Sequence, residues 1–175
     1  MSTTTVEIEQ ELVDKIVERF PETVKEKYLD WHTLIVDRED IAPMCEMLKT
    51  DGEYDFKFLT DLSGVDYLEH MEVVYHMYSY GLQHKLCLKV KVKPDDLLVP
   101  SVTSVWSTAD WHEREAYDLF GIVFEGHPNL KRILCADDFP GHAFRKDFPL
   151  ENDEEYLLRD EKTAEDYGIS EDLPS

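Results

Sequence analysis

Residues 106–150 read WSTADWHEREAYDLFGIVFEGHPNLKRILCADDFPGHAFRKDFPL, and the rest of the chain is best understood from this stretch outward. Its first third predicts a short helix. Thr108 or Asp110 can cap the N-terminus, because such side chains accept hydrogen bonds from the free N–H groups of a first helical turn. Gly121 follows Phe120, and glycine commonly marks the C-terminal end of a helix. We therefore expect a helix that ends at Phe120.

The remainder of this stretch is irregular but apolar. Glycine and proline exclude a long helix or strand, and they stand at Gly126, Pro128, Pro140, Gly141 and Pro149. Disordered segments contain few aromatic side chains. The segment after Gly121 instead contains large apolar and aromatic side chains, at Phe124, Leu130, Ile133, Leu134, Phe139, Phe144 and Phe148. Such a segment must pack against something, either its own domain or another protein.

The charged residues of the stretch form a second pattern. At helical spacing, one face carries Trp111, Arg114, Glu115 and Asp118. Arg114 and Asp118 have the i,i+4 spacing of an ion pair. The segment that follows is locally basic, with Lys131, Arg132, Arg145 and Lys146 against Asp137, Asp138 and Asp147. In an acidic chain this reversal indicates a docking surface or an internal ion-pair network, and a solvated charged face is the alternative.

These motifs resemble the signature of a known family. They are ERE at 113–115, DLFG at 118–121, GHP at 126–128, RIL at 132–134, GH at 141–142 and RKDFP at 145–149. Their spacing is similar to that of the 30 kDa subunit of respiratory complex I, the proton-pumping NADH:quinone oxidoreductase. The match covers about a quarter of the chain. One position departs, because the family usually has proline after Gly-His and this chain has Ala143.

The resemblance implies a subunit without a cofactor or catalysis of its own. In that family, iron–sulfur clusters, flavin and quinone lie on partner subunits, and the complex couples electron transfer from NADH to quinone with proton translocation. The subunit is expected in the peripheral arm, on the cytoplasmic side of the inner membrane. Its expected partners are the large-hydrogenase-like subunit and the neighbouring iron–sulfur subunit.

The same resemblance implies a set of interface or structural residues and no catalytic, cofactor or metal ligands. These residues are Glu113, Arg114, Glu115, Asp118, His127, Pro128, Arg132, Arg145, Lys146, Asp147 and Phe148. Related subunits serve complexes fed by NADH, reduced ferredoxin or deazaflavin, and others occur in membrane-bound hydrogenases. An equivalent subunit of one of those complexes is therefore the alternative.

The composition of the whole chain excludes several functions. With 39 acidic and 18 basic residues, the formal net charge is −21, so binding to nucleic acid or to an anionic membrane surface is not expected. No apolar run approaches the roughly 18–20 residues that cross a bilayer. The N-terminal MSTTTVEIEQ lacks the pattern of a signal peptide. We therefore expect a cytoplasmic protein without direct membrane insertion.

The cysteine spacing and the absence of nucleotide-binding motifs argue against a cofactor site on this chain. Cys45, Cys87 and Cys135 are more than 40 positions apart and no CxxC occurs, which predicts reduced thiols and no zinc or iron–sulfur site. Neither GxGxxG nor GxxxxGK[ST] is present, so no cradle for NADH or ATP is recognisable.

The remaining sequence predicts one α+β domain. Apolar periodicity predicts helices over 6–20 and 37–48, with two short strands between them in 24–36. Strands are expected at 56–62, 72–80 and 84–92, the last with lysines along the face opposite its apolar side chains. A helix, two strands, a helix and three strands with hairpin links predict a two-layer domain over 1–105. The signature helix and an extended docking segment follow at 106–150, and a partly mobile acidic tail at 151–175.

A free-standing metal enzyme is the alternative from another class. Glu115 and Asp118 at i,i+3 could form a carboxylate pair for acid–base chemistry or for a hard metal ion, and His127 could add a ligand. Di-iron bundles, however, need such pairs from more than one helix. The neighbouring bases also offer these carboxylates ion-pair partners, so a structural role is expected.

Overall fold

The structure is a computed structural model in which residues 3–28 and 31–149 are described, so the expected acidic tail at 151–175 lies outside the described residues. The helices are α1 (Thr3–Arg19), α2 (Ile41–Thr50) and α3 (Ala109–Phe120). The strands are β1 (Val24–Tyr28), β2 (Trp31–Val36), β3 (Phe58–Asp66), β4 (Met71–Ser79), β5 (His84–Val92), β6 (Leu98–Pro100) and β7 (Val123–Glu125).

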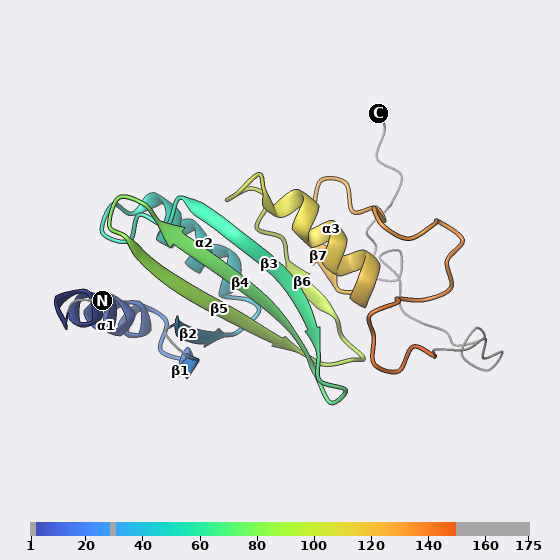
Figure 1. Cartoon of the computed structure of the whole chain (residues 1–175), viewed down its shortest axis with the longest axis horizontal. Coiled ribbons are helices and arrows are strands. Elements are labelled where there is room, and N and C mark those ends of the chain that lie inside the picture. The colour runs from blue at the N-terminus through green and yellow to red at the C-terminus, as the bar shows by residue number, and fades with distance from the viewer. Residues whose placement is uncertain (1–2, 29–30, 150–175) are drawn as a thin grey trace.

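Five of the strands form one mixed sheet in the order β1-β2-β5-β4-β3 (Figure 1). β5 pairs antiparallel with β4 and parallel with β2, so the sheet is not built from hairpin links alone as the sequence suggested. The short strands β6 and β7 form a separate parallel pair. Both lie in stretches where the sequence predicted no strand. The α+β class is confirmed.

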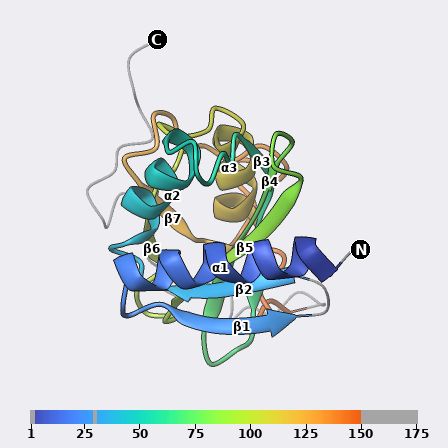
Figure 2. The same ribbon diagram turned by 90° about the vertical axis from the view of Figure 1, so that its left-hand side faces the viewer.

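The sheet is curved around the helices, which all lie on its concave side (Figure 2). Its inward-facing side chains alternate along the strands and join the helices in one continuous core. In β5 these are Leu86, Leu88, Val90 and Val92, as the alternation predicted. From α2, the side chains of Ile41, Met44, Cys45 and Leu48 are fully buried in the same core.

No helix of the described residues covers the convex face of the sheet, which is lined by charged and aromatic side chains. Lys89 lies 3.3 Å from a carboxylate oxygen of the buried Glu72 and 3.6 Å from Glu26, so the lysine face does have acidic neighbours. Towards the β4–β5 turn, aromatic rings pack edge to face, as those of Phe58 and Tyr80 do at 4.6 Å between ring centroids. Phe58 is 49% exposed and Tyr80 is 65% exposed.

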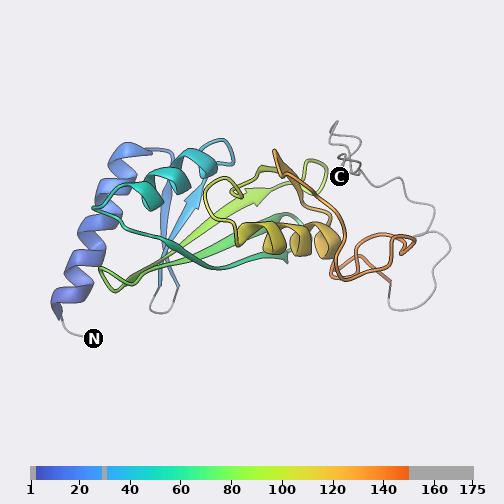
Figure 3. The same cartoon turned by 90° about the horizontal axis from the view of Figure 1, so that it is seen from above.

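The last described part of the chain lies at the end of the molecule opposite α1 (Figure 3). α3 packs beside β3, where the Phe120 ring would meet any Cβ added to Gly64 at 2.7 Å. After β7, residues 126–149 wrap around the C-terminal end of α3 without regular structure. None of the helices in the described residues is long and apolar enough to cross a membrane.

Candidate interaction surface

α3 begins and ends where the sequence indicated. Thr108 precedes its first residue, although the Thr108 side chain makes no capping hydrogen bond. Gly121 ends the helix in the left-handed conformation with φ of 78°, which favours glycine. A Cβ on Gly121 would also meet the ring of His142 at 2.7 Å. Glycine is therefore required here both by the backbone and by the segment packed against the helix end.

Asp118 fastens the irregular segment to α3. Its carboxylate is fully buried, and Oδ2 accepts hydrogen bonds from the backbone N–H groups of Ile133, Leu134 and Cys135 at 2.7–3.0 Å. Arg132 Nη1 lies 3.6 Å from Oδ1 and donates to the Gly141 carbonyl oxygen. Burial acts to raise the pKa of Asp118, but the three N–H donors outweigh it and the pKa is lowered.

Further contacts continue along the segment. The buried His142 donates from Nδ1 to the Asp118 carbonyl oxygen at 2.9 Å, and Phe144 N donates to the Leu119 carbonyl oxygen at 3.0 Å. Lys146 N donates to Asp66 Oδ2 at 2.7 Å, which ties the segment to the end of β3. The segment therefore lies on its own domain, one of the two possibilities left open by its composition.

On the outer face of α3, the expected pair of Arg114 with Asp118 is wrong, whereas the ion pair expected of Glu115, within the chain or with a partner, stays a prediction. Arg114 does not pair with Asp118; its Nε donates to the Lys131 carbonyl oxygen at 3.0 Å, and the guanidinium stacks on Trp111. Glu115 is exposed and forms no ion pair with any residue that the structure describes. The buried ion pair expected of Asp118 with a base of the segment is confirmed in Arg132.

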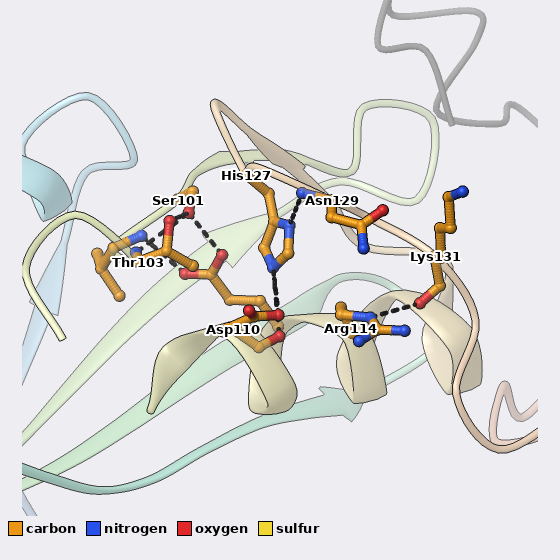
Figure 4. Close-up of polar contacts among 9 residues, drawn as sticks. Ser101, Thr103, Asp110, Arg114, His127, Asn129 and Lys131 are labelled. Atoms are coloured by element: carbon orange, nitrogen blue, oxygen red, sulfur yellow. Dashed lines mark hydrogen bonds and ion pairs between the residues drawn. The ribbon is translucent and has the colours of Figure 1, made fainter. Parts of the chain in front are cut away.

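Glu113 is the second fully buried carboxylate of α3. Oε2 accepts a hydrogen bond from Ser101 Oγ and Oε1 accepts one from Val102 N, both at 2.7 Å (Figure 4). Burial raises the pKa of Glu113 to about 7, although these two hydrogen bonds oppose the shift. Glu113 thus ties α3 to the loop after β6, and nothing local in the sequence distinguishes it from the exposed Glu115.

His127 is held at the other end of α3. Its Nε2 donates to the Asp110 carbonyl oxygen at 3.2 Å, and Nδ1 accepts from Asn129 N at 2.9 Å (Figure 4). Burial lowers the pKa of His127, so the ring is neutral. Asp110 and Asp118 are two turns apart, about 12 Å along the helix axis. His127 and Asp118 are therefore not arranged around one metal ion, and no such group occurs among the described residues.

The remaining predicted site residues shape the end of the segment. Arg145 Nε lies 3.2 Å from Asp147 Oδ1, and the rings of Phe148 and Phe139 stack with centroids 5.5 Å apart. Pro128 is exposed beside the buried His127. Side chains directed to solvent are also present, since Leu134 and Phe144 are each more than 60% exposed. The segment is therefore held by buried contacts, and it exposes Leu134 and Phe144 together with charged side chains.

Comparison with known proteins identifies the family. Residues 34–154, which include α3 and the whole segment, match the family described as respiratory-chain NADH dehydrogenase, 30 Kd subunit. The chain belongs to this family. An NADH-quinone oxidoreductase subunit from Coxiella burnetii is 38% identical over 177 residues, covering 81% of this chain and 78% of that protein. The equivalent protein from Geotalea uraniireducens is 42% identical, with 79% and 87% covered. The resemblance seen in the motifs is confirmed.

Solved structures agree with this family assignment. A trypsin-resistant fragment of Nqo5 matches with a TM-score of 0.60 and 33% identity, over 70% of this chain and 99% of the fragment. A chain of an archaeal membrane-bound sulfane sulfur reductase matches with a TM-score of 0.69 at 24% identity, over 81% and 85%, which is a likeness of fold. The chain is therefore a complex I-type subunit of an NADH-quinone oxidoreductase.

Proposed function

We propose that this chain is a cofactor-free assembly subunit of the peripheral arm, on the cytoplasmic side of the membrane. It helps to hold the path of electrons from NADH through iron–sulfur clusters to quinone, coupled to proton translocation. Residues 132–149, here called the docking segment, contact the large-hydrogenase-like subunit and the neighbouring iron–sulfur subunit. Other subunits carry the flavin, the clusters and the quinone.

One observation carries this proposal: the docking segment is anchored to α3 by buried contacts, yet it exposes apolar side chains to solvent. Three N–H groups bound by Asp118 fix its path, while Leu134 and Phe144 stay exposed. Interfaces favour such anchors, because a side chain already held in place loses little conformational freedom on binding.

The chemistry of the cysteines supports the absence of a cofactor on this chain. Iron–sulfur clusters bind thiolates. Burial raises the pKa of Cys45 and raises that of Cys87 to about 11. Burial and the neighbouring Asp118 raise the pKa of Cys135. Among the described residues, no cysteine belongs to a group of three or more His, Cys, Asp or Glu side chains that could hold a metal ion.

Co-purification with quinone reductase activity tests the proposal. We expect Arg145→Ala and Phe148→Ala to leave the sheet folded and to release the subunit from its complex. Leu134→Ala is a sharper test, because the Leu134 side chain is 62% exposed, whereas the Phe144 ring also packs on Phe120 of α3. Truncating an interface anchor often costs about 2 kcal/mol or more of binding free energy.

The control must lie on another surface. Lys89 is unsuitable, because its side chain is only 18% exposed and pairs with Glu72. Lys93→Ala and Leu82→Ala replace exposed residues after β5 and in the β4–β5 turn. If these controls release the subunit while the docking-segment variants retain it, the contact lies on the sheet and the proposal is wrong.

A further inference from the structure

The outer face of α3 holds an arginine whose side chain is fixed at two points. Arg114 Nε donates to the Lys131 carbonyl oxygen at 3.0 Å (Figure 4). The guanidinium carbon lies 5.0 Å from the centroid of the Trp111 ring. Trp111 and Arg114 are three residues apart on one helix, which places them side by side. We call Trp111, Arg114 and Lys131 the Trp–Arg patch.

The hydrogen-bonding capacity of Arg114 is mostly unused. Its terminal nitrogens, Nη1 and Nη2, make no hydrogen bond or ion pair with any residue that the structure describes. The chain has 39 acidic residues, and the adjacent Glu115 is exposed, yet no described carboxylate pairs with this guanidinium.

The apolar part of the patch is equally unusual. Trp111 is 63% exposed, on a helix whose other aromatic residues, Tyr117 and Phe120, pack against the domain. A solvated helix face gains nothing from a tryptophan, whereas tryptophan and arginine are the residues enriched where binding energy concentrates. The stacked arrangement also fixes the guanidinium before a partner arrives.

We infer that the Trp–Arg patch binds a carboxylate side chain of a neighbouring subunit in the assembled complex. The two free terminal nitrogens of Arg114 match the two oxygens of a carboxylate in a bidentate pair. The indole of Trp111 covers the apolar stem of the same acidic side chain, and Lys131 adds a second positive charge. This inference rests on the proposed function, since it requires that the chain be assembled with protein partners.

A phosphate-bearing polymer or membrane could also bind a guanidinium. The net charge of −21 disfavours both, because long-range repulsion opposes the approach of a polyanion. A single acidic side chain within a protein interface avoids this cost, since it brings one charge to one arginine.

The experiment uses the complete complex purified through another subunit. We expect Trp111→Ala and Arg114→Lys each to weaken retention of this chain at least about tenfold, since lysine keeps the charge but not the planar fork. Tyr80→Ala is the matched control, because Tyr80 is 65% exposed on the convex face of the sheet. Thermal melting of Trp111→Ala and Tyr80→Ala should equal that of the wild type, because these side chains are exposed. Melting of Arg114→Lys measures how much the hydrogen bond to the Lys131 carbonyl oxygen contributes, so that a loss of retention can be compared with it.

Cross-linking identifies the chemical class of the partner group. A carbodiimide joins an amine directly to a carboxylate in contact with it, so Lys131 should couple to an aspartate or glutamate of another subunit. Lys93, exposed elsewhere, should not couple. Wild-type retention in the complex is the internal reference, and its loss would refute the proposed function itself.

Three results would overturn the inference while leaving the proposed function intact. The first is full retention of Trp111→Ala and Arg114→Lys. The second is a carbodiimide product that joins Lys131 only to acids of its own chain. The third is normal assembly of the variants together with loss of binding to vesicles containing phosphatidylserine, which would assign the patch to a lipid phosphate.

Discussion

Asp118 shows how one carboxylate can position a whole segment. Its carboxylate accepts hydrogen bonds from three backbone N–H groups, which would otherwise lack an acceptor near the end of α3. The same carboxylate forms an ion pair with Arg132. Removing one partner of a buried pair leaves the other uncompensated, which is more costly than losing the pair as a whole. The arrangement is therefore intolerant of truncation at this position.

Asp118→Ala should destabilise the domain by about 3–5 kcal/mol. The loss should be concentrated at residues 130–149, where trypsin cleavage at Arg132 should become faster. Glu115→Ala is the control on the same helix. Because Glu115 is exposed, its removal should change the free energy of unfolding by less than about 1 kcal/mol. Denaturant unfolding of the two variants measures the difference, and equal values would mean that the segment is held by other contacts.

Glu113 should make stability depend on pH. Its folded pKa, about 7, lies above the ordinary value of 4.5. The folded chain then holds a proton that the unfolded chain has lost, so this contribution is complete below pH 4.5 and is lost as pH rises to about 7. A pKa difference of this size corresponds to about 3 kcal/mol. Glu113→Gln keeps the shape without the titration, so the variant should gain stability relative to wild type from pH 5 to pH 8.

The pH experiment compares the two proteins at each pH, because His127 acts in the opposite direction. Burial lowers the folded pKa of His127, so its contribution to stability rises as pH passes through the ordinary histidine range. Both proteins contain His127, and the difference between them isolates Glu113. A difference that stays constant between pH 5 and pH 8 would show that Glu113 is ionised in the folded chain.

At the scale of elements, glycine is required at the end of α3 both by the positive φ of Gly121 and by its contact with His142. Alanine substitutions at three glycines separate these two effects. Gly121 has positive φ and stands against His142, Gly126 has positive φ in open space, and Gly52 has neither constraint. Alanine should be neutral at Gly52 and cost about 1 kcal/mol at Gly126. At Gly121 the cost should be about 2–4 kcal/mol, because the clash with His142 adds to the backbone strain. Thermal melts of the three variants test this order, and equal losses at Gly121 and Gly126 would contradict the contact with His142.

The sequence predicted the elements with strong local signals. The alternation in 84–92 gave the bounds of β5, and Gly121 gave the end of α3. The strands β6 and β7 were missed, because three residues carry no recognisable period and their pairing joins segments 20 positions or more apart. The parallel pairing of β2 with β5 was missed for the same reason, since register between distant strands is set by the core.

The sequence identified several residues of the site but not the groups that each of them contacts. Helical spacing grouped Arg114, Glu115 and Asp118 on one face, yet burial separates Asp118 from the other two. The partners of Asp118 are backbone N–H groups, and those of Glu113 are Ser101 and Val102, none of which has a sequence signal. The contact of Asp66, whose carboxylate accepts a hydrogen bond from Lys146 N, could not be predicted either, because 80 positions separate the two residues.

At the scale of the whole molecule, two surfaces are candidates for the contact with partner subunits. One consists of the docking segment and the Trp–Arg patch, on the outer side of α3. The other is the convex face of the sheet, where Phe58 and Tyr80 are exposed. Charged side chains on the convex face pair within the chain, as Lys89 does with Glu72 and Glu26. Arg114 has no such pairing among described residues, which favours the α3 side.

Hydrogen exchange of the isolated chain and of the complete complex should separate these surfaces. In the isolated chain, the amides of Ile133, Leu134 and Cys135 should exchange faster than those of β4 and β5, because opening the segment breaks few apolar contacts, whereas opening the sheet exposes the core. Assembly should slow exchange in residues 132–149 and in the turn of α3 around Trp111 and Arg114. Amides of β3 and of the β4–β5 turn should keep their rates and serve as the internal control. Slowing confined to β3 and the β4–β5 turn would place the partner on the convex face and contradict both the docking segment and the Trp–Arg patch.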